Sequence, residues 1–144
     1  MEPHTKLQRL KDAGFRHVGE WKLNTNELQC VLTNCEDAVN VLYAFECRGE
    51  ILYIGKSVRS LAKRMYGYQN PGLSQLTNID TNKLIREILG EHKIISIYAF
   101  VDSGKLLHGE FQVNLAAGLE DDLIDKLLPV WNKVGLSKSK IKRV

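Results

Sequence analysis

Glu120 is an acidic residue within an otherwise apolar row near the end of the 144-residue chain. A helix expected over residues 115–128 turns by about 100° per residue, which places Glu120 near the centre of its apolar face. That face consists of Leu119, Leu123 and Leu127, with Ile124 and Leu128 beside them. A carboxylate that points into a core is unfavourable unless it is paired, hydrogen-bonded or bound to a metal. Glu120 is therefore either the salt-bridge partner of an arginine or a metal ligand or acid at the floor of a cleft.

A second predicted helix offers the matching cation. Arg64 and Tyr68 are four residues apart and share one edge of its buried stripe. Arg59 and Lys63 project from the other side, as solvated charges do. Arg64 is either a structural partner of Glu120 or a guanidinium that binds a phosphate oxygen through charge-assisted hydrogen bonds. Both interpretations bring Arg64 and Glu120 together.

Two tyrosines lie on consecutive apolar runs. Tyr43 and Tyr53 are ten residues apart, and a turn centred on Gly49 separates the runs, which is typical of a β-hairpin. The spacing sets Tyr43 roughly opposite Tyr53 or one position off, so the two are expected to be cross-strand neighbours. Tyrosines in strands are usually packing residues, but a phenolic oxygen can act as a base when a cation or hydrogen bond lowers its pKa.

The elements that must position these groups mix helices and strands. Their order predicts an α+β fold: a small, mainly antiparallel sheet with a β-hairpin, flanked by helices, plus an N-terminal extension. The predicted elements are a helix over 5–13, two short strands within 15–33, a hairpin of 41–45 and 51–55, a helix over 58–68 capped by Ser57, a long polar loop over 69–81, a helix over 82–90, a strand over 94–101, and a helix over 115–128 that Asn114 caps and Pro129 ends.

Composition limits the class of protein. A length of 144 residues with 44% hydrophobic content favours one compact domain. No apolar run approaches the roughly 20 residues that span a bilayer, so we expect no membrane partner. Three cysteines without metal-ligand spacing, behind a polar N-terminus, favour reduced thiols in the cytoplasm. The net charge of +3 permits a polyanionic partner without requiring one.

The ordered motifs resemble the GIY-YIG nuclease superfamily across residues 40–132. The resemblance is carried by Val41-Leu42-Tyr43, Tyr53-Ile54-Gly55, Arg64, Glu120 within Leu-Glu-x-x-Leu-Ile, and Pro129-Val130-Trp131-Asn132. Val-Leu-Tyr departs from the first tripeptide of the family, and Tyr68 stands where homing and some restriction members carry a histidine. The small size and the Tyr-Ile-Gly-Lys-Ser stretch are closest to the free-standing restriction and phage branch.

The resemblance implies a role for each matched residue. Tyr43 would activate water or act as the general base, Tyr53 would orient groups around the scissile phosphate, and Arg64 would neutralise that phosphate. Glu120 would be the one protein ligand of Mg²⁺ or Mn²⁺. The remaining members of the implied catalytic set are Tyr68, which replaces the histidine, Asn132, which closes the site, and Lys56, a phosphate contact.

Other residues are candidates for DNA binding. Gln75, Thr77 and Asn78 carry amide and hydroxyl groups in the predicted loop and could read base edges. The tail after residue 132 is basic and includes Lys138 and Lys140, which could neutralise phosphates regardless of sequence. Arg59 and Lys63 complete this set.

The sequence thus predicts an N-terminal extension over 1–40, a GIY-YIG-like nuclease core over 41–132 and a basic tail over 133–144. The leading hypothesis is a metal-dependent endonuclease that cuts double-stranded DNA site-specifically, as a homodimer or by sequential nicking. The alternatives are a nonspecific repair or DNA-degrading nuclease, and an inactive nucleic-acid-binding module on the same fold.

Overall fold

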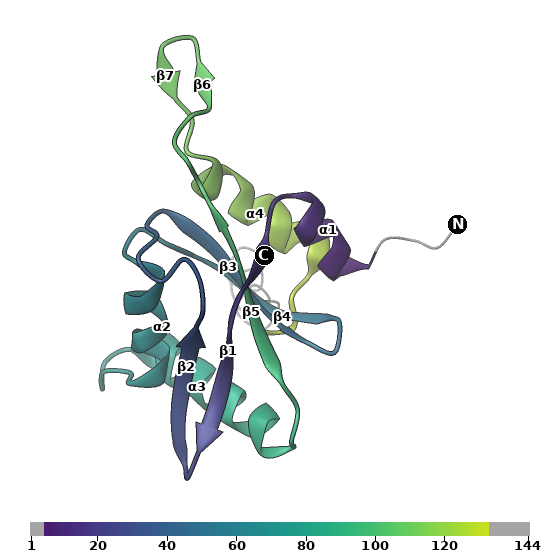
Figure 1. The fold of residues 1–144 in the computed structure, drawn as a ribbon, viewed down its shortest axis with the longest axis vertical. Helices are drawn as coiled ribbons and strands as arrows, with labels where there is room; N and C mark the ends of the chain where they lie inside the picture. Colours follow the sequence, from purple (N-terminus) through teal and green to yellow (C-terminus); the bar gives the residue numbers. More distant parts are fainter. Residues whose placement is uncertain (1–4, 133–144) are drawn as a thin grey trace, which may run out of the picture.

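A five-stranded antiparallel sheet flanked by helices forms the body of the protein in the computed structural model, which describes residues 5–132 (Figure 1). The elements in chain order are α1 (Lys6–Asp12), β1 (Arg16–Asn24), β2 (Glu27–Leu32), β3 (Val41–Cys47), β4 (Glu50–Ser57), α2 (Leu61–Gln69), α3 (Leu76–Gly90), β5 (Ile95–Val101), β6 (Leu107–His108), β7 (Phe111–Gln112) and α4 (Leu115–Leu127). The predicted α+β class with a small antiparallel sheet is confirmed.

The strands of the sheet follow the order β2-β1-β5-β3-β4, and every neighbouring pair is antiparallel. A two-residue turn closes the β3–β4 hairpin. Its residues, Arg48 and Gly49, have φ values of 52° and 84°. Two consecutive left-handed residues give a turn whose twist matches that of the strands. Strand β4 is left at one edge of the sheet.

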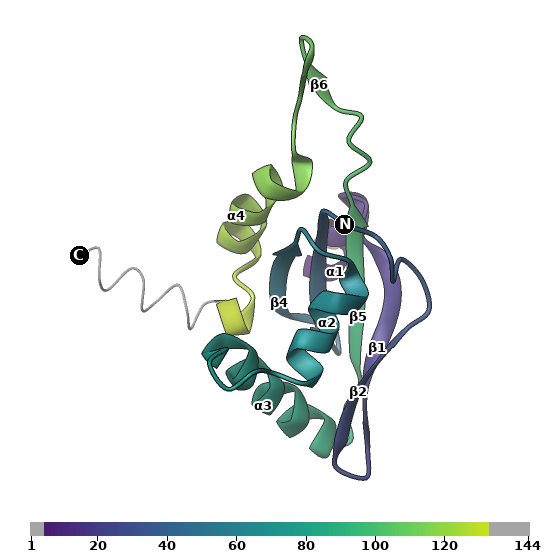
Figure 2. The ribbon, with the colours of Figure 1, turned by 90° about the vertical axis from the view of Figure 1, so that its left-hand side faces the viewer.

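Both faces of the sheet are covered. Strand β3 is buried along its whole length, and its side chains alternate between two apolar clusters. Tyr43 and Phe45 face the cluster that contains residues of α2 and α3, whereas Leu42 and Ala44 face the cluster that contains residues of α1 and α4. Helices α2 and α3 lie next to each other in both views (Figure 1, Figure 2). The core is therefore two apolar layers with the sheet between them.

The part of segment 1–40 that the structure describes joins this sheet. Strand β1 pairs with both β2 and β5, and Trp21 is 1% exposed in the same cluster as Tyr43. Leu10 and Phe15 belong to the opposite cluster. Residues 5–32 therefore share the sheet and the core with residues 41–132.

Two predicted helix starts are wrong. The second helix starts at Leu61, because β4 continues to Ser57. The capping hydroxyl is that of Ser60, not that of Ser57, and it accepts the N–H of Lys63 in the first turn. Val58, expected in the buried stripe, is exposed. The third helix begins at Leu76 instead of residue 82, so the loop spans only residues 70–75.

Three polar residues near the start of α3 are buried, namely Asn78, Thr81 and Asn82. Asn82 Nδ2 donates to the carbonyl oxygens of Tyr68 and Gln69, at 2.8 and 3.3 Å. These are carbonyl groups of the last turn of α2, which have no partner within their own helix. The polar composition of the first turns of α3 therefore serves a helix–helix contact.

A small hairpin of β6 and β7 projects beyond the sheet as an arm (Figure 1, Figure 2). It occupies the connection between β5 and α4, for which the sequence predicted no helix or strand. Leu107 and Phe111 on the arm are exposed.

Candidate active site

Three side chains form a closed hydrogen-bonded triangle where β3 meets α2. The hydroxyl oxygens of Tyr43 and Tyr68 are 2.6 Å apart. Arg64 Nε donates to the Tyr43 hydroxyl at 3.0 Å, and Arg64 Nη2 donates to the Tyr68 hydroxyl at 2.7 Å. Both tyrosines are fully buried and Arg64 is half-buried. The structure thus unites three of the predicted site residues.

The triangle leaves part of the arginine available. A guanidinium carries five N–H donors. Two of them bind the tyrosines, and Nη1 donates a third to Asn78 Oδ1 at 3.2 Å. One N–H on each Nη nitrogen therefore has no acceptor among the described residues. Two such donors can bind two oxygens of one phosphate together, which is the strongest way for an arginine to hold that group.

The register of the hairpin places the two predicted tyrosines diagonally. Tyr43 pairs with Gly55, and Phe45 pairs with Tyr53, because a β-bulge next to Phe45 adds one residue to β4. The prediction that Tyr43 lies opposite Tyr53 or one position off is therefore wrong. The ring centroids of Tyr43 and Tyr53 are nevertheless only 6.2 Å apart, since diagonal neighbours share a face of the sheet.

Gly55 makes room for the Tyr43 phenol. A Cβ atom at Gly55 would lie 2.5 Å from the Tyr43 hydroxyl oxygen and 2.9 Å from the Tyr53 ring. Both distances are shorter than a carbon side chain can tolerate, so only glycine lets the phenol lie across β4. The glycine of Tyr53-Ile54-Gly55 is thus explained by the position of a tyrosine on the neighbouring strand.

Burial decides the protonation of the two phenols. Removal from water raises the pKa of Tyr43 and of Tyr68 above the usual value for tyrosine, and the positive charge of Arg64 only partly opposes the shift. Both phenols are neutral at neutral pH. One of their two hydroxyl protons lies in the 2.6 Å hydrogen bond, and the other has no acceptor among the described residues.

Helix α4, which carries Glu120, is anchored at its N-terminus by a polar cluster. Asn114 caps the helix as predicted, since its Oδ1 accepts the N–H of Ala117. The Asp102 carboxylate accepts the N–H groups of Leu115 and Gly104, at 2.8 and 2.9 Å, and an N–H of Asn40. The sequence analysis missed Asp102, although an acid directly after an apolar strand is a signal that could have found it.

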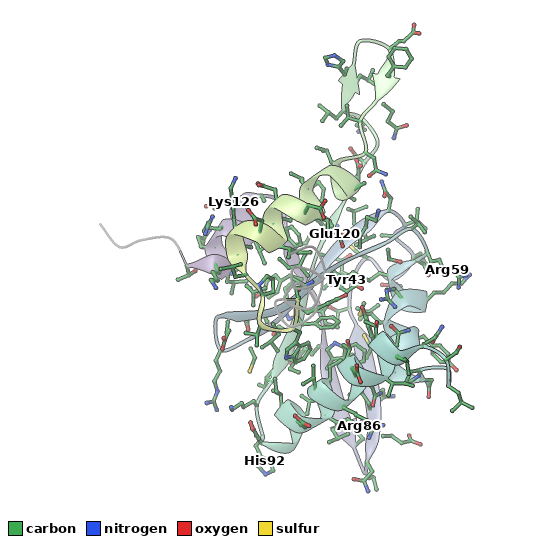
Figure 3. All side chains as sticks on the ribbon, turned by 180° about the vertical axis from the view of Figure 1, so that it is seen from behind. Tyr43, Arg59, Arg86, His92, Glu120 and Lys126 are labelled. Carbon is green, nitrogen blue, oxygen red and sulfur yellow. The ribbon has the colours of Figure 1, made fainter. Side chains whose placement is uncertain are left out.

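Glu120 is half-buried on α4 (Figure 3). Desolvation raises the pKa of its carboxyl group, and the Lys56 ammonium opposes that shift. No hydrogen bond or ion pair joins Glu120 to another residue of the described range. Leu128, predicted on the same apolar face, is exposed because the helix ends there in a left-handed residue.

Glu120 and Arg64 reach the edge strand β4 from different sides of the sheet. The triangle belongs to the face covered by α2 and α3, whereas α4 packs on the other face. The ion pair between Arg64 and Glu120, one of the two alternatives that the sequence left open, is not formed, because Arg64 is engaged by the tyrosines and Asn78. Lys56 is the cation whose charge acts on Glu120, and it also lines the groove next to Arg64.

Glu120 can hold a divalent cation only if substrate and water supply most of the other ligands of the metal. Residues 5–132 contain no cluster of three or more His, Cys, Asp or Glu side chains able to hold a metal. Mg²⁺ is commonly held by one or two carboxylates while substrate phosphates and water fill its other positions. A half-buried carboxylate without a hydrogen bond from a described residue suits that role.

Asn132 binds the exposed edge of β4. Its Oδ1 accepts the N–H of Ile54 at 2.7 Å, and its Nδ2 donates to the Ile54 carbonyl at 2.9 Å. The preceding Trp131 packs its ring against Phe45, with centroids 6.3 Å apart. Asn132 therefore substitutes for a neighbouring strand at this point of the edge, and it fixes the chain after α4 to the strand that carries Tyr53.

A cationic groove of about 330 Å³ adjoins the triangle. Its charged lining residues are all basic, and one hydroxyl and two amide side chains complete the polar lining. Those residues are Lys56, Ser57, Arg59, Lys63, Arg64, Gln75 and Asn78. The structure thus brings four predicted DNA-binding residues together with Arg64 and Lys56. Thr77 is exposed and is not part of the lining, and Lys138 and Lys140 lie outside the described residues.

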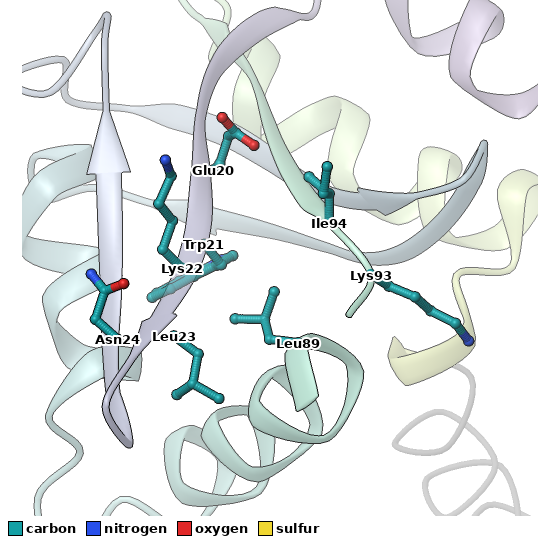
Figure 4. Close-up of a pocket in the computed structure, with 8 residues that line it drawn as sticks. All are labelled: Glu20, Trp21, Lys22, Leu23, Asn24, Leu89, Lys93 and Ile94. Atoms are coloured by element: carbon teal, nitrogen blue, oxygen red, sulfur yellow. The ribbon is translucent and has the colours of Figure 1, made fainter. Parts of the chain in front are cut away.

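A second cavity, of about 310 Å³, lies between β1 and the end of α3 (Figure 4). Its charged side chains do not converge. Lys93 extends away from the apolar walls formed by Leu23 and Leu89, while Glu20 and Lys22 point to another side (Figure 4). This cavity therefore lacks the arrangement of polar groups that the groove at Arg64 offers.

Comparison with known proteins places the fold. No family model and no curated protein matches the chain. A structure of bacteriophage T4 EndoII, a glutamate-to-alanine mutant, matches with a TM-score of 0.66 and 21% identity over 90% of this chain and 99% of that chain. The restriction endonuclease HPY188I in complex with product DNA matches with a TM-score of 0.53 and 18% identity over 87% of this chain and 80% of that chain.

Because both sequence identities are low, the matches establish a shared fold alone. The protein has the α+β architecture that the two nuclease structures share. None of the helices between residues 5 and 132 combines the length and the hydrophobicity needed to cross a bilayer.

Proposed function

We propose that this protein is a divalent-metal-dependent DNA endonuclease of the GIY-YIG type, which hydrolyses phosphodiester bonds. The observation that carries the proposal is the Tyr43–Tyr68–Arg64 triangle, because it leaves two arginine N–H donors at the end of an all-cationic groove. The two nuclease structures that share the fold support the same class of reaction.

Each residue has a definite task in this reaction. The two remaining N–H donors of Arg64 would bind two oxygens of the scissile phosphate and neutralise the charge that develops on them. Tyr43 would first release its own proton to solvent, and Arg64 and the Tyr68 hydroxyl would stabilise the resulting phenolate. The phenolate would then take the proton of the attacking water and become neutral again. Lys56 would bind the phosphate between Arg64 and Glu120, and Tyr53 would orient the strand.

Glu120 would hold Mg²⁺ or Mn²⁺ through its carboxylate. When bound, such a cation polarises a phosphate oxygen and stabilises the leaving oxygen. The water oxygen forms a bond to phosphorus while the bond from phosphorus to the 3′ oxygen breaks. The leaving oxygen takes up a proton, so the products carry a 5′-phosphate and a 3′-hydroxyl.

The test is cleavage of plasmid DNA by purified protein with Mg²⁺ or Mn²⁺. Glu120→Ala is expected to reduce the cleavage rate by about a hundredfold or more, because the metal supplies several kcal/mol of stabilisation. DNA binding measured without divalent metal should persist. Asp125→Ala removes an exposed carboxylate from the same helix and is the matched control. Wild-type cleavage by Glu120→Ala would refute the assignment.

We further propose restriction-type, site-specific cutting of double-stranded DNA. One site per chain requires a homodimer or two successive nicks to cut both strands. Sequencing the ends of products from mixed DNA separates the alternatives. One recurrent motif supports site-specific cutting, and scattered ends support a repair or DNA-degrading nuclease. Binding without cleavage under any divalent ion supports an inactive binding module. Light scattering with and without DNA gives the oligomeric state.

A further inference from the structure

Asn78 occupies a position that its sequence context did not predict. It was expected in an exposed loop, but it lies in the first turn of α3 and is only 9% exposed. Both ends of its amide are engaged: Oδ1 accepts from Arg64 Nη1 at 3.2 Å, and Nδ2 donates to Gln75 Oε1 at 3.2 Å. A buried amide with a donor and an acceptor already bound is poorly suited to reading a base edge.

The contact with Asn78 fixes the third nitrogen of the guanidinium. Tyr43 and Tyr68 bind Nε and Nη2, and Asn78 binds Nη1, so Arg64 is held by acceptors from two helices and a strand. A guanidinium is planar, and the directions of its two free N–H donors follow from the three bound ones. Asn78 therefore helps to decide where a phosphate can be gripped.

Gln75 links this contact to the mouth of the groove. Its Oε1 accepts from Asn78 Nδ2 and from the N–H of Gly72, while its side chain is exposed and lines the groove. The Gln75 amide nitrogen makes no hydrogen bond to a residue of the described range. Among the three predicted base readers, Gln75 is thus the exposed groove residue whose amide donor has no acceptor among residues 5–132.

We propose that Asn78 is a positioning residue that acts through Arg64, and that Gln75 is the group of this pair that contacts DNA. The inference rests on the proposed nuclease function. It predicts that loss of Asn78 slows the chemical step and leaves DNA affinity unchanged, whereas loss of Gln75 weakens DNA binding.

The first test separates turnover from binding. Asn78→Ala is expected to lower kcat by about ten- to a hundredfold, because misplacement of a binding group by an ångström has that effect. Its Kd for duplex DNA without metal should change by no more than about twofold. Kd would rise further only if Asn78 stabilised bound DNA as much as it stabilises the transition state. Gln75→Ala should raise Kd instead. Glu87→Ala, an exposed site on the same helix, is the matched control. An unchanged kcat, or a raised Kd for Asn78→Ala, overturns the proposal.

A double-mutant cycle tests whether Asn78 acts through Arg64. If Asn78 acts only through Arg64, Asn78→Ala should produce little further loss of kcat in an Arg64→Lys background, so the two effects should fall well short of additivity. Fully additive losses would show that Asn78 acts on the DNA itself and would overturn the proposal. Thermal unfolding of each variant checks that the fold is retained.

A spectroscopic readout keeps this inference separate from the nuclease proposal. Side-chain ¹⁵N NMR of the free protein reports hindered rotation of the Arg64 guanidinium. The signals that are absent from the spectrum of Arg64→Lys identify those of Arg64. Asn78→Ala should accelerate rotation at Nη1, and unchanged rotation overturns the proposal even if the wild type cleaves. Absence of cleavage by the wild type would refute the nuclease function while leaving the NMR result to decide the role of Asn78.

Discussion

The folded state partly removes the Glu120 carboxylate from water, which is unfavourable for its charge. The Glu120 carboxyl group has a pKa raised by desolvation, and no described residue donates a hydrogen bond to it. A structural salt bridge would have the opposite signature, because a bound partner lowers the pKa of a carboxyl group. The residue that the sequence marked as anomalous therefore has no structural partner among the described residues, and this supports its proposed role as a metal ligand.

Replacement of Glu120 should accordingly separate stability from activity. Glu120→Gln removes a charge that the fold desolvates, so we expect thermal stability at neutral pH to rise while cleavage is lost. Thermal unfolding without metal, paired with the plasmid assay, measures both effects. Asp125→Asn, on the solvent side of the same helix, should alter neither. A lower melting temperature for Glu120→Gln would instead favour a structural role.

The buried phenols predict a loss of stability at alkaline pH. Tyr43 and Tyr68 keep their protons in the folded state because burial raises the pKa of each. Unfolded tyrosines ionise near their usual pKa of about 10. The unfolded state then binds fewer protons than the folded state, so stability is full below about pH 10 and falls above it.

Above about pH 10, each of the two tyrosines lowers the free energy of unfolding by about 1.4 kcal/mol per pH unit. Denaturant unfolding between about pH 9 and pH 11 measures the slope. Tyr68→Phe should lose one such contribution, and Tyr66→Phe, an exposed tyrosine of the same helix, should retain both. An unchanged slope for Tyr68→Phe would contradict the burial of a neutral phenol.

At the scale of elements, β4 positions the site because its Gly55 lets the strand pack against the Tyr43 phenol. Gly55→Ala would place a Cβ atom 2.5 Å from the Tyr43 hydroxyl oxygen. We expect a loss of about 1–3 kcal/mol in the free energy of unfolding from this overpacking, and a loss of cleavage as Tyr43 leaves Arg64. Chemical denaturation and the plasmid assay test the two effects.

Gly118→Ala is the control for that substitution, since a Cβ atom there meets nothing within 4 Å. It lies in α4, where alanine is a better helix former, so stability should rise by roughly 0.5–1 kcal/mol. If Gly55→Ala and Gly118→Ala shift stability in the same direction, the close approach of Tyr43 is not the reason for glycine at position 55.

Helix α4 depends on one carboxylate for its placement. Asp102 accepts the N–H of Gly104, just after β5, and the N–H of Leu115 at the start of the helix, and these hydrogen bonds lower the pKa of its carboxyl group. The folded state therefore favours the ionised form. This contribution is present above the usual carboxyl pKa of about 4 and is lost as the pH falls through the lower folded value.

Asp102→Asn should lower the melting temperature at neutral pH and remove that acid-dependent part of the stability. Thermal unfolding from pH 7 to pH 3 measures it. Because α4 carries Glu120, the variant should also respond less to Mg²⁺ in the plasmid assay. An Asp102→Asn profile that parallels the wild type at every pH would show that the helix is anchored by other contacts.

At the scale of the whole molecule, the charge of the groove governs DNA affinity. Each phosphate that a cation neutralises adds about 0.9 to the slope of log K against log salt concentration. Lys63→Gln should therefore reduce the slope by about 1 and weaken binding to all sequences alike. Lys83→Gln, an exposed lysine of α3 outside the groove, should leave it unchanged. Equal slopes for Lys63→Gln and wild type would place the DNA elsewhere.

The amino-acid sequence alone determined the class of fold and singled out most of the residues that the structure brings together at the candidate site. Glu120 broke a helical period, Tyr43 and Tyr53 followed strand alternation, and Arg64 lay at the edge of an apolar stripe. These are local patterns, and local patterns report which face of an element is buried. The hairpin, the helix around Glu120 and its Asn114 cap follow from them.

Only the tertiary structure decided how these residues meet. The bulge beside Phe45 set Tyr43 against Gly55, and α2 buried the polar first turns of α3, so that Asn78 became a partner of Arg64. Arg64 bound two phenols and an amide in place of Glu120. Such contacts depend on register and on packing between distant segments, and neither quantity is encoded in the spacing of residues along one element.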